Sequence, residues 1–153
     1  MSRTATNRSQ RTYPISDVLA ILQDPSALIS LNPLVVSHSL LPPADPTSPS
    51  TTWTITDSLK LLGIFNTTTT YTGTFTPSGE RAVEVVAHAA AGVVSKARWS
   101  VDEDGTVVEE GEIEAPWWLM GYVYGQWKAS HALLMERMEE RLSARRLENE
   151  GSG

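Results

Sequence analysis

The sequence predicts an α+β domain in which an antiparallel sheet of about seven strands packs against a long C-terminal helix, in the order strand, two short helices, six strands and a helix. Two observations support this fold class. Residues 116–148 carry apolar side chains at helical spacing. Residues 34–115 alternate short extended segments with turn-forming residues. The chain has 153 residues, and we expect a single domain over residues 1–150, with 151–153 as a flexible tail or a cloning remnant.

The C-terminal helix is the element that the pattern supports best. At about 100° per residue, eight side chains fall within an arc of about 100°: Met120, Val123, Tyr124, Trp127, His131, Leu134, Met138 and Leu142. Pro116 suits the first turn, where its missing N–H would have no partner in any case. Such a helix is not stable alone in water, so its stripe must lie against a broad apolar surface.

The chain before the sheet is expected to form one strand and two helices. Residues 2–13 alternate weakly and suit an edge strand. Ile15–Leu22 has helical spacing, with Ser16 as its expected N-cap. A second short helix is expected over Pro25–Leu31, with the proline in its first turn, and Asn32-Pro33 ends it.

Six extended segments follow, separated by stretches rich in proline, glycine and aspartate: residues 34–41, 51–59, 66–75, 81–89, 93–101 and 106–115. Strands joined in series by short loops form an antiparallel meander. Alternate residues of a strand point to opposite faces, so each strand has one face toward the helix and one toward solvent.

This alternation assigns aromatic side chains to the inner face. The expected inner residues are Trp53, Ile55 and Asp57 in one strand, Tyr71 and Phe75 in the next, Trp99 in a third, and His38 with Leu34, Val36 and Leu40 in the first. In the last strand we expect Val107, Gly111 and Ile113 inside, and Glu110, Glu112 and Glu114 in solvent.

The direction of His88 depends on the turn at residues 90–92. A three-residue turn points His88 outward, whereas a two-residue turn would bring it inside together with Glu84. Because burying an unpaired glutamate is costly, we favour the outward direction.

Composition excludes several classes of function. The formal net charge of -6 argues against a nucleic-acid partner, which needs an excess of Lys and Arg. The sequence has no cysteine, its three histidines do not cluster, and it carries no nucleotide-binding or Gly-x-Ser-x-Gly motif. No stretch approaches the roughly 20 apolar residues of a membrane span, and the N-terminus lacks an apolar signal segment. We therefore expect a cytoplasmic protein without cofactor, metal or stable membrane insertion.

The inward stripe of the long helix is unusual in composition, since it offers Tyr124, Trp127 and His131 where a simple core would use aliphatic residues. Two interpretations stay open. The stripe is either aromatic core packing with a hydrogen-bonded histidine, or one wall of a cavity that binds a hydrophobic small molecule.

The cavity interpretation names candidate site residues. The expected substrate-binding side chains are Trp53, Phe75, Trp99, Met120, Trp127 and Leu134, and the expected catalytic ones are His131, Tyr124, His38, Tyr71 and Asp57. An imidazole can act as acid or base near neutral pH, and a phenol can hold a carbonyl. The plainer alternative for each histidine is a bond to a backbone carbonyl, and for Asp57 it is a turn acceptor.

The element order, together with the stretches Asp24–Val36, Trp53–Asp57, Ala91–Val93 and Trp99–Val101, resembles the START-like (SRPBCC) helix-grip superfamily, in particular an uncharacterised fungal branch of it. The resemblance covers nearly the whole chain. It implies a curved sheet wrapped round the long helix with a cavity between them. Members include lipid carriers, plant hormone receptors, allergens and polyketide aromatase/cyclases. The superfamily shares no catalytic signature, so no catalytic residue follows from the resemblance.

Two functions are compatible with these observations. We favour a cofactor-independent cyclase that closes a ring, by a pericyclic (Diels–Alder-type) step or an isomerisation, on a polyketide- or terpenoid-like intermediate of fungal secondary metabolism. The alternative is a non-catalytic carrier or sensor of a hydrophobic metabolite or lipid. A purely structural interaction module would be favoured instead if the aromatic residues proved fully packed.

The outer side of the long helix raises a further question. Gly121, Gly125, Ala129 and Ala132 line up opposite the aromatic stripe, although interior glycine costs a helix about 1 kcal/mol relative to alanine. Either this face packs on a second copy of the chain in a homodimer, or residues 117–125 are irregular and the helix begins near Gln126. Beyond Leu134, three arginines (Arg137, Arg141 and Arg145) are expected to form a solvated basic ridge.

Overall fold

Seven antiparallel strands form one sheet in the order β1-β7-β6-β5-β4-β3-β2. The computed structural model describes residues 1–61 and 64–151. Its elements are β1 (Ser2–Thr12), α1 (Ile15–Leu22), α2 (Pro25–Ser30), β2 (Val35–Leu40), β3 (Thr51–Leu61), β4 (Phe65–Pro77), β5 (Ala82–His88), the 3₁₀ turn η1 (Ala90–Gly92), β6 (Val94–Val101), β7 (Thr106–Glu114) and α3 (Trp117–Gly151).

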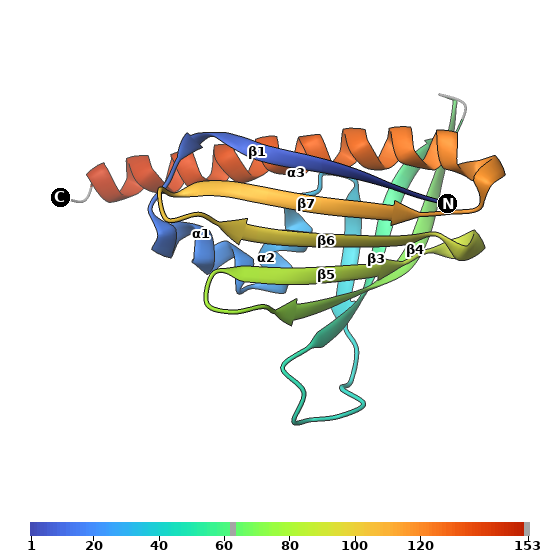
Figure 1. Cartoon of the computed structure of the whole chain (residues 1–153), viewed down its shortest axis with the longest axis horizontal. Coiled ribbons are helices and arrows are strands. Elements are labelled where there is room, and N and C mark those ends of the chain that lie inside the picture. The colour runs from blue at the N-terminus through green and yellow to red at the C-terminus, as the bar shows by residue number, and fades with distance from the viewer. Residues whose placement is uncertain (62–63, 152–153) are drawn as a thin grey trace.

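The sheet is strongly curved, and the helices share one of its faces. Figure 1 shows β2, β3 and β4 running at a steep angle to β1, β6 and β7, with α1, α2 and α3 behind the sheet. We name the face toward the helices the inner face. The predicted α+β class, with a curved antiparallel sheet and a long C-terminal helix, is confirmed.

Most predicted boundaries differ from the observed ones by one or two residues, and the turn that decides His88 is confirmed. η1 supplies three turn residues, so Val83, Val85 and Ala87 face inward and His88 is exposed. The expected cap of α1 is wrong, because Pro14 occupies the N-cap position and no side chain caps this helix. In α2, by contrast, the Asp24 carboxylate accepts the backbone N–H of Ala27 at 3.3 Å.

The prediction for β2 is wrong in part. A register shift lies between Val35 and Ser37, so alternation does not hold across Val36. Val35 consequently packs against the core, whereas Val36 is 59% exposed. Leu34 and Leu40, expected inside, are also exposed, and His38 is half-buried.

Helix α3 is continuous from Trp117, so the alternative of an irregular segment before Gln126 is wrong. Gly121 and Gly125 are exposed, and a Cβ at either position would meet nothing within 4 Å among the described residues. The helix also includes Gly151, which we had assigned to a flexible tail; residues 152–153 lie outside the described part of the chain. In the described chain, no helix has the length and apolar character needed to cross a membrane.

The C-terminal half of α3 closes one end of the fold. Its side chains Met135, Met138 and Leu142 share a core with α1, α2 and the inner residues of β5, β6 and β7. We call this part the closed end. Polar contacts fasten it: the Glu139 carboxylate accepts the Tyr13 hydroxyl at 3.0 Å and two backbone N–H groups of the β1 bulge. Arg145, expected in solvent, pairs with the buried Asp17 at 3.3 Å.

Candidate functional site

Small side chains occupy the centre of the inner face beyond the closed end. The sheet register aligns inner residues in rows that cross neighbouring strands. One row reads Gly111, Ala97, Val85 and Phe75, and the next reads Ile113, Ser95, Ala87, Gly73 and Trp53. Five of these nine positions hold glycine, alanine or serine. Little side-chain volume therefore projects from the sheet where it faces the N-terminal half of α3, and we call this area the low surface.

Several residues around this low surface remain partly exposed although they face the helix. Val85, Ala87 and Ser95 on the sheet are half-buried, as are Trp53 and Tyr71 at its side. Helix α3 packs chiefly on β1, β7 and α1, so it leaves β3, β4 and β5 less closely covered. We name these five residues the open inner face. Trp53, Tyr71 and Val85 also pack against the main core, so each is only partly exposed. A partly exposed apolar surface that carries aromatic rings suits a hydrophobic small molecule.

Trp127 bounds the open inner face on the side of α3. Its indole N–H donates to the Ser95 hydroxyl at 2.8 Å, and its ring lies directly on Gly111. A Cβ on Gly111 would lie 2.6 Å from Cζ2 of this indole, which is closer than such atoms can approach. Gly111 is therefore the position that lets the indole approach β7 so closely. Met120 and Ile113 complete a second small core around it.

His131 stands one turn further along α3 and contacts a buried carboxylate. Its Nδ1 lies 2.5 Å from Oε2 of Glu109, which is only 1% exposed, and the amide of Asn7 donates to the other carboxylate oxygen at 2.9 Å. The imidazole also packs on the indole of Trp127, with ring centroids 4.8 Å apart. Every fully buried side-chain nitrogen and oxygen of the described residues has a partner, and Nε2 of His131 makes no hydrogen bond among them, so Nε2 is not fully buried; the side chain as a whole is 15% exposed.

Glu109 is not among the residues predicted for the site, although its position in β7 carries the signal. Glu109 has the same parity as Val107, Gly111 and Ile113, which were assigned to the inner face, and the structure confirms that face. It was overlooked because glutamates of this strand were expected in solvent. Its burial is possible because Asn7 and His131, from β1 and α3, satisfy both oxygens.

A second polar pair lies on the β3–β4 side of the inner face. The Tyr71 hydroxyl donates to Oδ1 of Asp57 at 3.3 Å, and Asp57 is 8% exposed. Burial raises the pKa of the Asp57 carboxyl, and the hydrogen bond from Tyr71 opposes that rise. Burial, the charge of Asp57 and their hydrogen bond all raise the pKa of the Tyr71 phenol, so the shared proton stays on the phenol.

The other two predicted catalytic residues lie apart from these pairs. Nε2 of His38 is 2.8 Å from the Ser26 hydroxyl, and its ring centroid is 5.6 Å from that of Trp53, at the β2 edge. The Tyr124 hydroxyl donates to the backbone carbonyl of Thr4 at 3.1 Å, and its ring lies under the Arg3 guanidinium. Tyr124 therefore fastens α3 to β1 rather than offering a free hydroxyl.

The predicted binding residues divide into two groups. Trp53 belongs to the open inner face, and Trp127 is bonded to Ser95 at its border. Phe75 and Trp99 are 4% and 2% exposed and belong to the core of the closed end, with Leu134 packed against it. Met120 is 1% exposed and supports Trp127 from below. These four residues shape the protein around the site instead of lining it.

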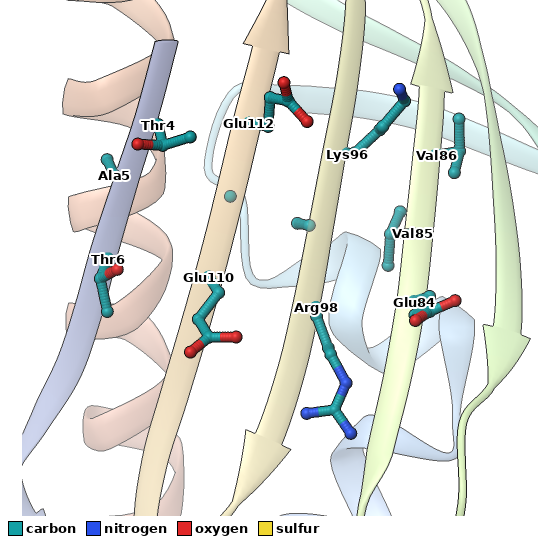
Figure 2. Close-up of a pocket in the computed structure, with 12 residues that line it drawn as sticks. Thr4, Ala5, Thr6, Glu84, Val85, Val86, Lys96, Arg98, Glu110 and Glu112 are labelled. Atoms are coloured by element: carbon teal, nitrogen blue, oxygen red, sulfur yellow. The ribbon is translucent and has the colours of Figure 1, made fainter.

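A depression lies on the opposite face of the sheet. Figure 2 shows its side chains on β1, β5, β6 and β7, with the helices on the far side. Arg98 is in register with Glu84 and Glu110, and Lys96 with Glu112. Alternating charges of this kind are typical of a solvated sheet surface, so we do not assign a hydrophobic ligand to it. No group of three potential metal ligands occurs among the residues that the structure describes.

Comparison with known protein families identifies the family of this chain. The sequence fits the family described as "Domain of unknown function (DUF7053)" over residues 11–144. The protein belongs to this family. A comparison with curated proteins found no match.

Solved structures with the same architecture confirm the START-like helix-grip fold. The di-domain aromatase/cyclase BexL, from the BE-7585A biosynthetic pathway, superposes with a TM-score of 0.72 at 11% identity, over 92% of this chain and 50% of that one. The Zhui aromatase/cyclase from Streptomyces sp. R1128 gives 0.65 at 10% identity, over 92% and 96%. A START superfamily protein from Mycobacterium smegmatis gives 0.62 at 12% identity, over 94% and 97%. The DUF7053 chain thus spans about half the length of BexL and nearly all of the two single-domain proteins.

Proposed function

We propose that the protein binds a polyketide- or terpenoid-like intermediate, in the context of fungal secondary metabolism, on the open inner face and promotes its ring closure without a cofactor. The observation that carries this proposal is the position of His131. The imidazole packs on Trp127, whose indole is bonded to Ser95 of that face, while its Nδ1 is held by a buried carboxylate. The aromatase/cyclases of the same fold support the substrate class.

The chemistry requires only proton transfer and a fixed substrate conformation. Nε2 of His131 removes a proton from a carbon next to a carbonyl, and the resulting enolate carbon attacks a second carbonyl of the same molecule. The imidazolium then returns that proton to the new alkoxide, so the step is neutral in protons and electrons. Holding the two reacting carbons together supplies several kcal/mol more, about the scale of a well-oriented intramolecular reaction.

A pericyclic closure on the same surface would depend on conformation alone. It requires no proton transfer, and the rings of Trp53 and Trp127 would set the fold of the substrate. The two versions separate by mutation. Loss of turnover in His131→Gln supports the proton-transfer version, and unchanged turnover supports the pericyclic one.

A carrier or sensor is the second candidate, and one observation favours it. The polar groups on the open inner face are already engaged, since the Tyr71 hydroxyl is bonded to Asp57 and the Ser95 hydroxyl accepts from Trp127. A surface with few free polar groups can hold a hydrophobic molecule without transforming it.

The deciding experiment incubates the protein with a short poly-β-ketone thioester and follows cyclised product by liquid chromatography and mass spectrometry. We expect turnover above the uncatalysed rate, lowered about 10²–10⁴-fold in His131→Gln, the contribution typical of a general base. His88→Gln is the matched control, because His88 is exposed on the outer face. Tight binding of the thioester without turnover would establish the carrier, and failure to bind would overturn both candidates.

A further inference from the structure

We propose that Glu109, held by Asn7, is a positioning residue that fixes the neutral His131 in one tautomer, with the proton on Nδ1 and the lone pair on Nε2. This inference rests on the proposed function in assigning the proton transfer to His131. It adds two residues from β7 and β1 to the machinery and states which imidazole nitrogen meets the substrate.

The direction of the His131 hydrogen bond follows from the chemistry of the two groups that the contact joins. A neutral imidazole has one N–H and one acceptor nitrogen, and an ionised carboxylate can only accept. For an ionised Glu109 and a neutral His131, the 2.5 Å contact between Oε2 and Nδ1 therefore requires the proton on Nδ1. Nε2 is then left with its lone pair free, which is the form a general base requires.

Asn7 determines which carboxylate oxygen is available. Its amide nitrogen donates to Oε1 at 2.9 Å, so Oε2 is the oxygen left for His131. Asn7 and Glu109 are direct partners in the β1–β7 register, and this pairing fixes their relative position. The carboxylate is almost fully withdrawn from water, so its hydrogen bonds to Asn7 and His131 gain strength and cannot be replaced by solvent.

The packing of His131 limits its rotation. The indole of Trp127 covers one side of the imidazole, and that indole is itself held by Ser95 and by its close contact with Gly111. A carboxylate that orients a histidine also stabilises the imidazolium formed when Nε2 takes up a proton. Glu109 does not contact the substrate, and it acts through His131.

The test is the tautomer of His131 in the full chain labelled with [15N]histidine, observed by NMR through the ring nitrogens. We expect the neutral His131 to carry its proton on Nδ1 in the wild type. Glu109→Gln should abolish this single tautomer, because the amide can either donate or accept, and Glu109→Asp should restore it in part. His38 and His88 serve as internal controls whose signals stay unchanged in both variants.

Asn7→Ala provides a second variant if Glu109→Gln does not fold, since Asn7 is half-buried on an edge strand. Here we expect a mixture of tautomers. A wild-type His131 protonated on Nε2, or an Nδ1 tautomer that persists in Glu109→Gln, would overturn the inference.

Turnover of the poly-β-ketone thioester separates this inference from the proposed function. We expect Glu109→Gln to lower kcat about 10–100-fold with little change in KM. This is the range typical of a residue that orients a functional side chain through a hydrogen bond. A fixed tautomer in a protein without turnover would leave the positioning role standing and remove the proposed function. Turnover with a tautomer that is not fixed would do the reverse.

Discussion

The two halves of α3 lie over the same sheet, yet one half forms core and the other borders a site. In the C-terminal half, Met135, Met138 and Leu142 are 5%, 0% and 1% exposed. In the N-terminal half, Tyr124 and His131 stay half-buried around Trp127. The difference lies in what faces each half. The closed end presents α1 and bulky strand residues, whereas the other end presents glycine, alanine and serine. The size of the side chains on the sheet therefore decides where the helix packs closely enough to exclude water.

The largest expected effect is on stability at the closed end. Met138→Ala should lower the free energy of unfolding by about 2–5 kcal/mol, because a fully buried side chain is replaced by a cavity. Trp53→Ala, at the open inner face, should cost less despite its larger ring, since part of that ring is already in water. Urea unfolding measures both. Equal losses would show that the two ends do not differ in packing.

The next effect concerns the contact between Trp127 and β7. Gly111→Ala should cost about 1–3 kcal/mol, because the new methyl group overlaps the indole and forces it away. The displaced indole would also lose its bond to Ser95, so tryptophan fluorescence should change together with the unfolding midpoint. An unchanged spectrum and midpoint would contradict the close approach of the indole to β7.

The sequence predicted the fold well and the site only in part, for physical reasons. Helical spacing and strand alternation repeat over many residues, so they located α3 and all seven strands to within a few residues. Single positions were harder. The bulge at Val36 turned Val36 outward and Val35 inward, and the pairing that allows Glu109 to be buried depends on Asn7, more than a hundred residues away. The hydrogen bond from the Tyr124 hydroxyl to the backbone carbonyl of Thr4 likewise cannot be predicted until β1 is known to lie at the edge of the sheet.

The raised pKa of Asp57, in the Asp57–Tyr71 pair, should make the stability of the protein depend on pH. Burial raises the pKa of Asp57, so the folded state binds its proton more tightly than the unfolded state does. The penalty on the wild type therefore grows as the pH rises from the ordinary value of 3.8, is complete above the raised pKa, and is absent below 3.8. Asp57→Asn, which keeps an acceptor for Tyr71, should raise Tm at neutral pH and lose that gain in acid. A gain that is equal at both pH values would contradict the assignment.

The smallest expected effect is on the outer side of α3. Gly121→Ala should stabilise the protein by about 1 kcal/mol, since the added methyl group meets nothing and alanine favours the helix. The same variant tests whether the protein forms a homodimer through this face of α3. If the wild type sediments as a dimer and Gly121→Ala as a monomer, the glycines serve the interface. If the wild type is monomeric, that prediction is wrong.

The central claim is that the open inner face, and not the outer depression, receives a hydrophobic molecule. Ala87 and Val86 are neighbours on β5 that point to opposite faces, so they form a matched pair of probes. With methyl-labelled protein, titration with 2-naphthol followed by NMR should shift the Ala87 methyl signal while that of Val86 and that of Ala27, buried at the closed end, stay in place. A shift at Val86 with none at Ala87 would contradict the account.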